Sequence, residues 1–232
     1  MRSVKELRGY SIRATDGEIG RVHEFLFDDL TWTIRYLVVD TGDWLPGRKV
    51  LVSPAAVDRP DAEAESLAVG LTQAQVEDSP PLEADAPVSR QIESDLHEYY
   101  GWVPYWRTGV PAAGPGPIAA APVMAAEGAR APEAAEEEGK PPIDPHLRST
   151  REVTGYHIEA RDGDVGHVDD FVGEDDRWII RYLVVDTGNW LPGRKVLIAP
   201  TWSEVVNWAQ RIVSVDLKRE TVEKSPEFNQ SI

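Results

Sequence analysis

Histidines and clustered carboxylates are the side chains of this sequence that could bind a metal ion or carry out acid–base chemistry. The histidines lie at positions 23, 97, 146, 157 and 167. His167, with Asp169 and Asp170 close by, groups the ligand types of a metal site, and a solvated strand edge is the alternative interpretation. The carboxylate runs at 28–29 and 174–176 fall between predicted strands, where turn chemistry accounts for them. The sequence therefore predicts no catalytic residue, no metal site and no cofactor.

The composition excludes further classes of chemistry. The chain has 232 residues and no cysteine, which rules out disulfides, thiolate nucleophiles and cysteine-containing zinc sites. The glycine-rich segments lack the spacing that cradles phosphate groups, and no Ser–His–Asp arrangement can be assigned. We therefore predict a protein that is not an enzyme.

The charge distribution argues against polyanionic partners. The net charge is −16, and acidic residues outnumber basic ones in both halves of the chain and in the segment between them. Neutralising phosphates requires a clustered positive face, so direct binding to nucleic acid or to an anionic membrane surface is disfavoured. No stretch approaches the ~20 apolar residues of a membrane helix, and no signal-peptide core follows Met1. We expect a cytoplasmic protein without an integral membrane segment.

The strongest pattern is a duplication at a constant offset of 146 residues. Residues 35–51 return as residues 181–197 with a single change, Asp43 to Asn189. Between residues 9–54 and their counterparts, 29 of 46 aligned pairs are identical. A period this long indicates tandem domains, because the repeats of a solenoid are typically ~20–50 residues long.

Each copy has the pattern of short strands separated by turns. In the first copy we expect Asp16-Gly17 to form a hairpin turn and Gly20 to mark a bulge. We expect Thr72 to cap a short helix. The strands predicted around these turns cover residues 10–14, 18–27, 32–40, 48–53 and 66–71. The second copy repeats this plan. Five or six strands at this spacing predict a mainly β fold of two small antiparallel barrels in tandem, each with short helices.

The segment between the copies divides into three parts. Residues 89–100 have the apolar spacing of an amphipathic helix, and an aromatic cluster follows over residues 99–106. Residues 111–145 are rich in Ala, Pro, Gly and Glu without periodicity, which predicts a disordered linker. The domain boundaries that follow are a first barrel over 1–82, a linker over 83–148 and a second barrel over 149–232.

Both copies resemble the PRC-barrel domain family. The resemblance rests on three segments, namely the hairpin around residues 16–20 and the strands at 35–40 and 50–54, all of which recur in the second copy. The family includes the cytoplasmic part of the photosynthetic reaction-centre H subunit, the C-terminal half of the ribosome maturation factor and many stand-alone bacterial proteins. The resemblance implies a six-stranded antiparallel barrel that acts as a docking and scaffolding module.

A non-enzymatic protein-binding or scaffold function is what this resemblance implies. One alternative is a ribosome-assembly accessory factor, which would bind a basic ribosomal protein through its acidic barrels. A second alternative is an adaptor that is linked to a photosynthetic reaction centre or is peripheral to a membrane. The barrels could also pair with each other within the chain or in a homodimer, because domains of this size have small cores.

Two segments are candidate surfaces for a protein partner. The loop at 40–49 is retained in both copies, and either turn geometry or docking explains this, because Trp and Arg are enriched in interface hot spots. The aromatic cluster either packs back on the first barrel or binds a partner. The candidate partner-binding residues are Trp44, Arg48, Lys49, Trp190, Arg194, Lys195, Trp102 and Trp106.

Overall fold

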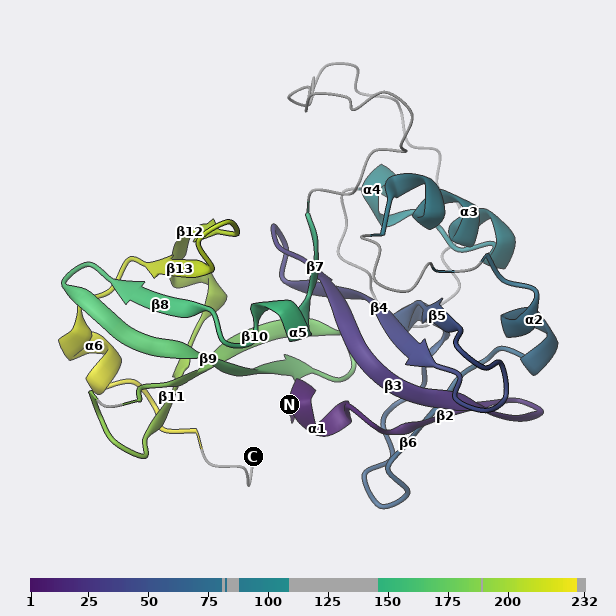
Figure 1. The fold of residues 1–232 in the computed structure, drawn as a ribbon, viewed down its shortest axis with the longest axis horizontal. Helices are drawn as coiled ribbons and strands as arrows, with labels where there is room; N and C mark the ends of the chain where they lie inside the picture. The colour runs from purple at the N-terminus through teal and green to yellow at the C-terminus, as the bar shows by residue number, and fades with distance from the viewer. Residues whose placement is uncertain (81, 83–87, 109–145, 189, 229–232) are drawn as a thin grey trace.

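The computed structural model describes residues 1–80, 82, 88–108, 146–188 and 190–228. These residues form a mainly β molecule in which the two copies, here called the first and second repeat, lie side by side (Figure 1). The predicted linker at 111–145 lies outside the described residues. None of the described helices is both long and apolar enough to cross a membrane.

The first repeat contains a curled sheet and three short helical elements. Its strands are β2 (Ser11–Ala14), β3 (Gly17–Asp28), β4 (Thr33–Asp40), β5 (Lys49–Val52) and β6 (Ser66–Ala68). Its helices are α1 (Val4–Leu7), the 3-10 helix Pro54–Ala56 and α2 (Gln73–Glu77). Thr72 caps α2 in a capping box with Gln75, as its position in the sequence predicted. Strand β1 (Arg2–Ser3) precedes this repeat, and α3 (Arg90–Tyr100) and α4 (Tyr105–Thr108) follow it.

The second repeat follows the same order of elements, with one additional strand, β12, after its 3-10 helix. Strand β7 (Leu147–Ser149) precedes this repeat and α5 (Thr150–Val153) is its first helix, and these correspond to β1 and α1. Its later strands are β8 (His157–Ala160), β9 (Gly163–Glu174), β10 (Ile179–Asp186), β11 (Lys195–Ile198), β12 (Ser203–Asn207) and β13 (Ile212–Val215). Its later helices are the 3-10 helix Pro200–Trp202 and α6 (Arg219–Glu223).

The prediction of purely antiparallel sheets was wrong. Strand β2 pairs with β6 in parallel, and β8 pairs with β13 in the same way. A tight hairpin forces antiparallel pairing, whereas β2 and β6 are separated by three other strands and a 3-10 helix, and a connection of this length permits either direction. The curled sheet is therefore mixed.

The two repeats do not form separate sheets, because their strands pair across a junction. Strand β1 pairs with β9 of the second repeat, and β7 pairs with β3 of the first. Strands β4 and β10 meet at Thr33 and Ile179. All thirteen strands consequently belong to one continuous sheet, instead of two independent barrels in tandem.

The junction obeys a pseudo-two-fold symmetry. The amide of Ile34 donates to the carbonyl of Trp178 (2.7 Å), and the amide of Ile180 donates to the carbonyl of Trp32 (2.8 Å). These two bonds interchange when 146 is added to or subtracted from each number, as do the pairings of β1 and β7. The junction is therefore isologous in the sense used for symmetric dimers, although both halves belong to one chain.

Aromatic side chains fill the centre of the junction. Trp178 lies against Phe25 with ring centroids 6.1 Å apart, and Phe27 contacts Phe171 at 5.8 Å and stacks on Trp32 at 5.3 Å. Both tryptophans have positive φ angles, 53° and 56°, a conformation that costs a non-glycine residue roughly 1–2 kcal/mol. The hydrogen bonds accepted by their carbonyls and the aromatic packing offset that cost. A single core of buried residues consequently runs through both repeats.

A bulge at Gly20 bends β3, as the sequence predicted. The register shifts so that Ile12 faces Gly20 while Arg13 faces Glu18. Gly20 has a φ of 141°, and a Cβ atom there would lie 2.1 Å from the carbonyl oxygen of Asp40. Gly166 is in the same position in the second repeat, with a φ of 128° and a distance of 2.0 Å to the carbonyl oxygen of Asp186. A side chain is excluded at both positions because strand backbone, and not a flexible side chain, occupies the space.

We predict that Gly20→Ala lowers the free energy of unfolding by about 3 kcal/mol, because it adds backbone strain and a clash with β4. Gly42→Ala is the matched control: Gly42 also has a positive φ, 55°, but nothing lies within 4 Å of its Cβ position. That variant should lose about 1 kcal/mol. Urea denaturation followed by circular dichroism measures both values, and equal losses would contradict the proposed close approach.

Candidate functional site

Hydrogen bonds within the repeat hold the retained loop at residues 40–49. The hydroxyl oxygen of Thr41 lies 2.7 Å from the carbonyl oxygens of Leu45 and Arg48, and both can accept its proton. The carboxylate of Asp40 accepts from the amide of Gly42 at 2.9 Å. In the second repeat Thr187 and Asp186 make the equivalent bonds. Turn geometry therefore accounts for the retention of Asp, Thr and Gly in both copies.

The candidate docking residues of these loops all have contacts within the chain. Trp44 and Trp190 are half-buried against the core, and Arg219 lies 4.6 Å from the centre of the Trp190 ring. Arg48 donates to the carbonyls of Glu77 and Ser79, and Arg194 donates to the carbonyl of Ser225. Lys195 pairs with Asp169 at 2.7 Å, whereas Lys49 faces the junction between the repeats. A docking role for these six residues stays a prediction.

Helix α3 packs on the outer face of the first repeat. For the segment 89–106, packing on the first barrel was one of two interpretations, and binding a partner was the other. This first outer face consists of Leu26, Tyr36, Val38 and Leu51, on the side of the sheet away from the main core. Leu96 of α3 is 1% exposed against it, and α3 lies above β4 and β5 in the view of Figure 1. Ser89 caps the helix at its start, and Gly101, with a φ of 68°, ends it.

A buried polar cluster joins the helix to this face. The hydroxyl of Tyr36 donates to the carboxylate of Glu93 at 3.0 Å, and the hydroxyl of Tyr105 donates to the same oxygen at 2.6 Å. Nε2 of His97 lies 2.9 Å from the hydroxyl of Tyr36. Because the single hydroxyl proton of Tyr36 goes to Glu93, Nε2 of His97 must carry the proton of that second bond. Burial lowers the pKa of His97 and so favours the neutral form with its proton on Nε2.

Electrostatic neighbours compensate the burial of Glu93, which is 0% exposed. Arg90 lies 3.3 Å from its second carboxylate oxygen. Burial and the adjacent carboxylate raise the pKa of Tyr36 well above its usual range. Burial lowers the pKa of His97. Both shifts favour the protonation states that the hydrogen bonds require, so the cluster can hold α3 in place near neutral pH.

Trp102 and Trp106 both contact the ring of His97, and Trp102 also packs against the main core. The ring centroids of Trp106 and His97 are 4.9 Å apart, and Trp102 stacks on Tyr100 at 4.3 Å. Arg90 lies 4.4 Å from the centre of the Trp106 ring. Both tryptophans are half-buried, and their role toward a partner stays a prediction.

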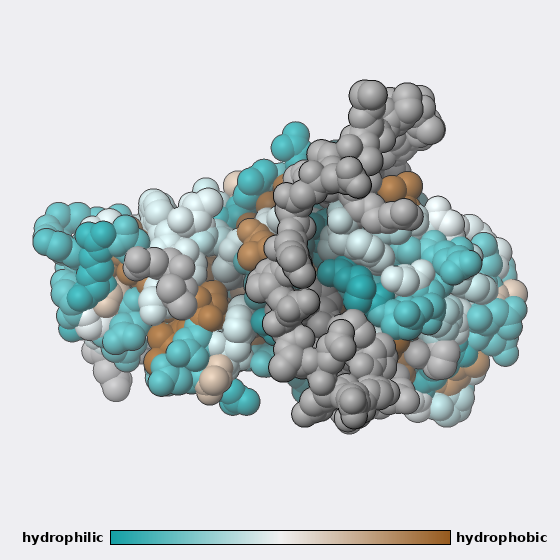
Figure 2. Space-filling view, turned by 90° about the horizontal axis from the view of Figure 1, so that it is seen from above, coloured by the Kyte–Doolittle hydropathy of each residue, from teal (hydrophilic) through white to brown (hydrophobic). Residues whose placement is uncertain are grey.

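The second repeat carries the counterpart of this face, the second outer face, formed by Val172, Tyr182, Val184 and Leu197. Tyr36 and Leu51 are 0% and 1% exposed beneath α3, whereas their counterparts Tyr182 and Leu197 are half-buried. The helices described in the second repeat, α5 and α6, correspond to α1 and α2, so α3 has no counterpart among them. Figure 2 shows the molecule from above, where the described surface is mostly hydrophilic with small hydrophobic patches.

The sequence grouping of His167, Asp169 and Asp170 does not come together as a metal site. Asp169 pairs with Lys195 and, at 3.5 Å, with Lys5. Asp170 accepts from the hydroxyl of Ser3 and from the amide of Lys5. Within the described residues, no group of three or more histidines and carboxylates is placed to hold a metal ion.

The first part of the chain matches a known protein family. The family model for the PRC-barrel domain matches residues 1–65, which extend from β1 to just before β6. The first repeat is a PRC-barrel domain. The family model does not detect the second copy, although 29 of 46 aligned residues in its first part are identical to those of the PRC-barrel domain. No curated protein matches the chain.

Sequence reasoning missed the residues that attach α3 to the PRC-barrel domain. The sequence placed Tyr36 in a buried strand and residues 89–100 in an amphipathic helix, and it assigned no role to Glu93 or His97. The signal that could have found them is their spacing: positions 93 and 97 are one helical turn apart on the same side as Leu96 and Tyr100. A carboxylate and a histidine on the apolar side of a helix require a buried partner.

We predict that protonation of His97 weakens the attachment of α3 to the PRC-barrel domain. Its pKa in the folded protein lies below the ordinary value of about 6.5, so the unfolded chain binds the proton more readily. The stability that neutral His97 provides is therefore complete above the ordinary pKa of about 6.5, and it declines as the pH falls from there through the lower pKa of the folded protein. His97→Gln keeps an N–H donor but cannot titrate, so it should lose less thermal stability than the wild type between pH 7.5 and pH 5.

The comparison must be made between the two proteins, because His23 also has a lowered pKa and contributes in the same direction in both. Melting temperatures from circular dichroism at several pH values give the two slopes. Parallel slopes for the wild type and His97→Gln would contradict the prediction.

Proposed function

We propose that this protein is a non-catalytic, protein-binding scaffold that holds an amphipathic helix of a partner protein on its second outer face. In this proposal each repeat is a PRC-type unit whose outer face is a helix-binding surface. The first unit binds the chain's own helix α3, and the second is available to a partner. The observation that supports it is α3 itself, because it reveals what kind of segment this type of face accepts.

The residue types of the two outer faces support the same kind of occupant. Tyr and Val are retained at positions 36 and 38 and at their counterparts 182 and 184, and Leu51 corresponds to Leu197. The ion pair between Arg35 and Asp28 (3.0 Å) corresponds to the pair between Arg181 and Glu174 (2.8 Å). The second face therefore offers the same apolar floor, tyrosine hydroxyl and edge arginine.

The greater exposure of Tyr182 and Leu197, beside the buried Val172 and Val184, supports a position for a helix at this part of the face. Leu147, which packs beside α3 on the first outer face, corresponds to Met1, which is 57% exposed and directly precedes β1, the strand that pairs with β9. Docking a helix would bury Met1, Tyr182 and Leu197 further, and burial of apolar surface is the main favourable term in such association. The partner helix should resemble α3, with apolar residues one turn apart and a carboxylate that can accept from Tyr182.

The chemistry of the polar cluster supports a binding role over a catalytic one. The hydroxyl of Tyr36, the carboxylate of Glu93 and Nε2 of His97 are all engaged with one another, and Tyr36 and Glu93 are both 0% exposed. Groups that are hydrogen-bonded to one another in this way attach a helix and are not available to a substrate. Such a buried polar network also selects partners, because a helix without the carboxylate would leave the tyrosine hydroxyl unpaired.

A labelled peptide with the sequence of residues 88–108 is the most direct probe, since it carries the chemistry of a known occupant. We expect it to bind the full-length protein saturably in fluorescence anisotropy. Leu197→Asp should weaken binding at least about tenfold, because it places a charge on the apolar floor of the face. Leu30→Asp is the matched control, since Leu30 is 70% exposed elsewhere, and it should bind like the wild type.

Equal binding by the wild type and Leu197→Asp, or no saturable binding at all, would refute the proposal. Light scattering identifies a different occupant: if the wild type forms a dimer that Leu197→Asp disrupts, a second copy of the chain covers the face instead. That outcome would overturn the assignment to a partner protein.

A further inference from the structure

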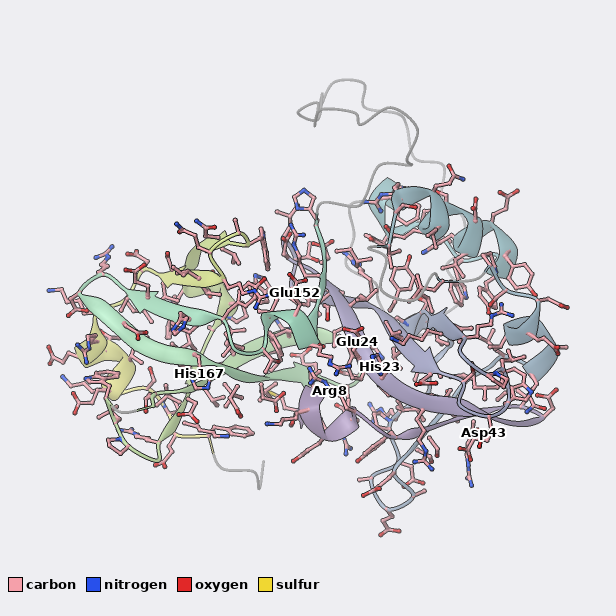
Figure 3. All side chains as sticks on the ribbon, viewed as in Figure 1. Arg8, His23, Glu24, Asp43, Glu152 and His167 are labelled. Atoms are coloured by element: carbon pink, nitrogen blue, oxygen red, sulfur yellow. The ribbon has the colours of Figure 1, made fainter. Side chains whose placement is uncertain are left out.

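Two pockets at the junction of the repeats are related by the pseudo-two-fold symmetry. The first junction pocket has a volume of about 440 Å³ and is lined by His23, Glu24, Lys49, Ser149, Arg151 and Glu152. The second junction pocket, of about 510 Å³, is lined among others by the counterparts Asp169, Asp170, Lys195, Ser3, Lys5 and Glu6. Figure 3 shows His23, Glu24 and Glu152 where the two repeats meet. The two pockets can therefore be compared residue by residue.

In the second junction pocket, two cations share one carboxylate. Asp169 lies 2.7 Å from the ammonium of Lys195 and 3.5 Å from that of Lys5. Lys195 belongs to β11 and Lys5 to α1, so Asp169 links the two repeats. The lysines lower the pKa of Asp169 despite its partial burial. This pocket shows that a carboxylate fits between the two cations.

In the first junction pocket, the carboxylate is replaced by an imidazole. His23 occupies the position of Asp169, while Lys49 and Arg151 occupy those of Lys195 and Lys5. Arg151 donates to Nε2 of His23 at 2.9 Å, which requires that nitrogen to be unprotonated. Burial and the adjacent lysine and arginine lower the pKa of His23 accordingly. Across the described part of the chain, neither Lys49 nor Arg151 forms an ion pair.

The two carboxylates that line the first junction pocket are bonded elsewhere. Glu24 accepts from the hydroxyl of Ser149, as its counterpart Asp170 accepts from Ser3. Glu152 accepts from the hydroxyl of Tyr156 at 3.0 Å. Neither of them replaces the missing carboxylate between the two cations.

We propose that the first junction pocket binds the carboxylate of a small organic acid between Lys49 and Arg151, in the place that the carboxylate of Asp169 has in the second. A guanidinium offers five N–H donors in a fixed fork, so Arg151 can bind a carboxylate while it keeps its bond to His23. A pocket of about 440 Å³ is in the size range of small-molecule sites. The acidic character of the whole chain favours a small anion over a polyanion.

Sodium acetate is a suitable probe because it carries the carboxylate of an aspartate without the backbone. We expect acetate, compared with sodium chloride at equal ionic strength and pH 7.5, to shift the amide resonances of Lys49 and Arg151 saturably. His23→Asp should abolish this response, because an internal carboxylate then fills the position, and should raise the melting temperature in the absence of acetate.

Two lysine variants complete the test. Lys49→Gln should weaken acetate binding at least about tenfold, as expected when one charged contact is lost. Lys195→Gln, its counterpart in the second junction pocket, should leave acetate binding unchanged. The proposal is overturned if the wild type shows no saturable shift, or if His23→Asp responds like the wild type. None of these outcomes depends on the helix-binding face, so the two proposals fail independently.

Discussion

The structure depends on the exchange of two short strands between the repeats. Strand β1 comes before the first repeat but pairs with the second, and β7 comes before the second repeat but pairs with the first. Ion pairs fix both ends of this exchange, between Arg148 and Asp29 at 3.0 Å and between Arg2 and Asp175 at 3.6 Å. A domain of about 80 residues has a small core, and the exchange merges two such cores into one.

Where the two repeats differ, the protein gains its distinctive surfaces. The shared core and the retained loops maintain the pseudo-symmetry, while helix α3 covers only the first outer face. His23 likewise stands in one junction pocket where Asp169 stands in the other. In both cases one copy shows an occupied position and the other shows the same position with half-buried or unpaired groups. Duplication thus supplies an internal reference for what each position can hold.

The sequence predicted the local structure well because local signals determine it. Gly20 forms the bulge and Thr72 caps α2 as expected. The hairpin turn falls at Thr15-Asp16, one residue before the predicted Asp16-Gly17, because Gly17 already pairs with Ala14 as the first residue of β3. The exchange of β1 and β7 was not predicted, because residues as few as Arg2–Ser3 carry no periodic pattern and their pairing is decided by tertiary contacts. The Tyr36–Glu93–His97 cluster was missed for the same reason: each residue is ordinary in its own element, and only the docking of α3 brings them together.

Native-state hydrogen exchange tests most directly whether the two repeats form one cooperative unit. The informative amides are those of Ile34 and Ile180, which donate across the junction to Trp178 and Trp32. If the exchanged strands and the shared core unite the repeats, these amides exchange only by global unfolding, with the same free energy as the amides of the central strands β3 and β9. Rapid exchange of Ile34 and Ile180 while β3 and β9 stay protected would mean that the repeats separate as independent domains, and it would contradict this account.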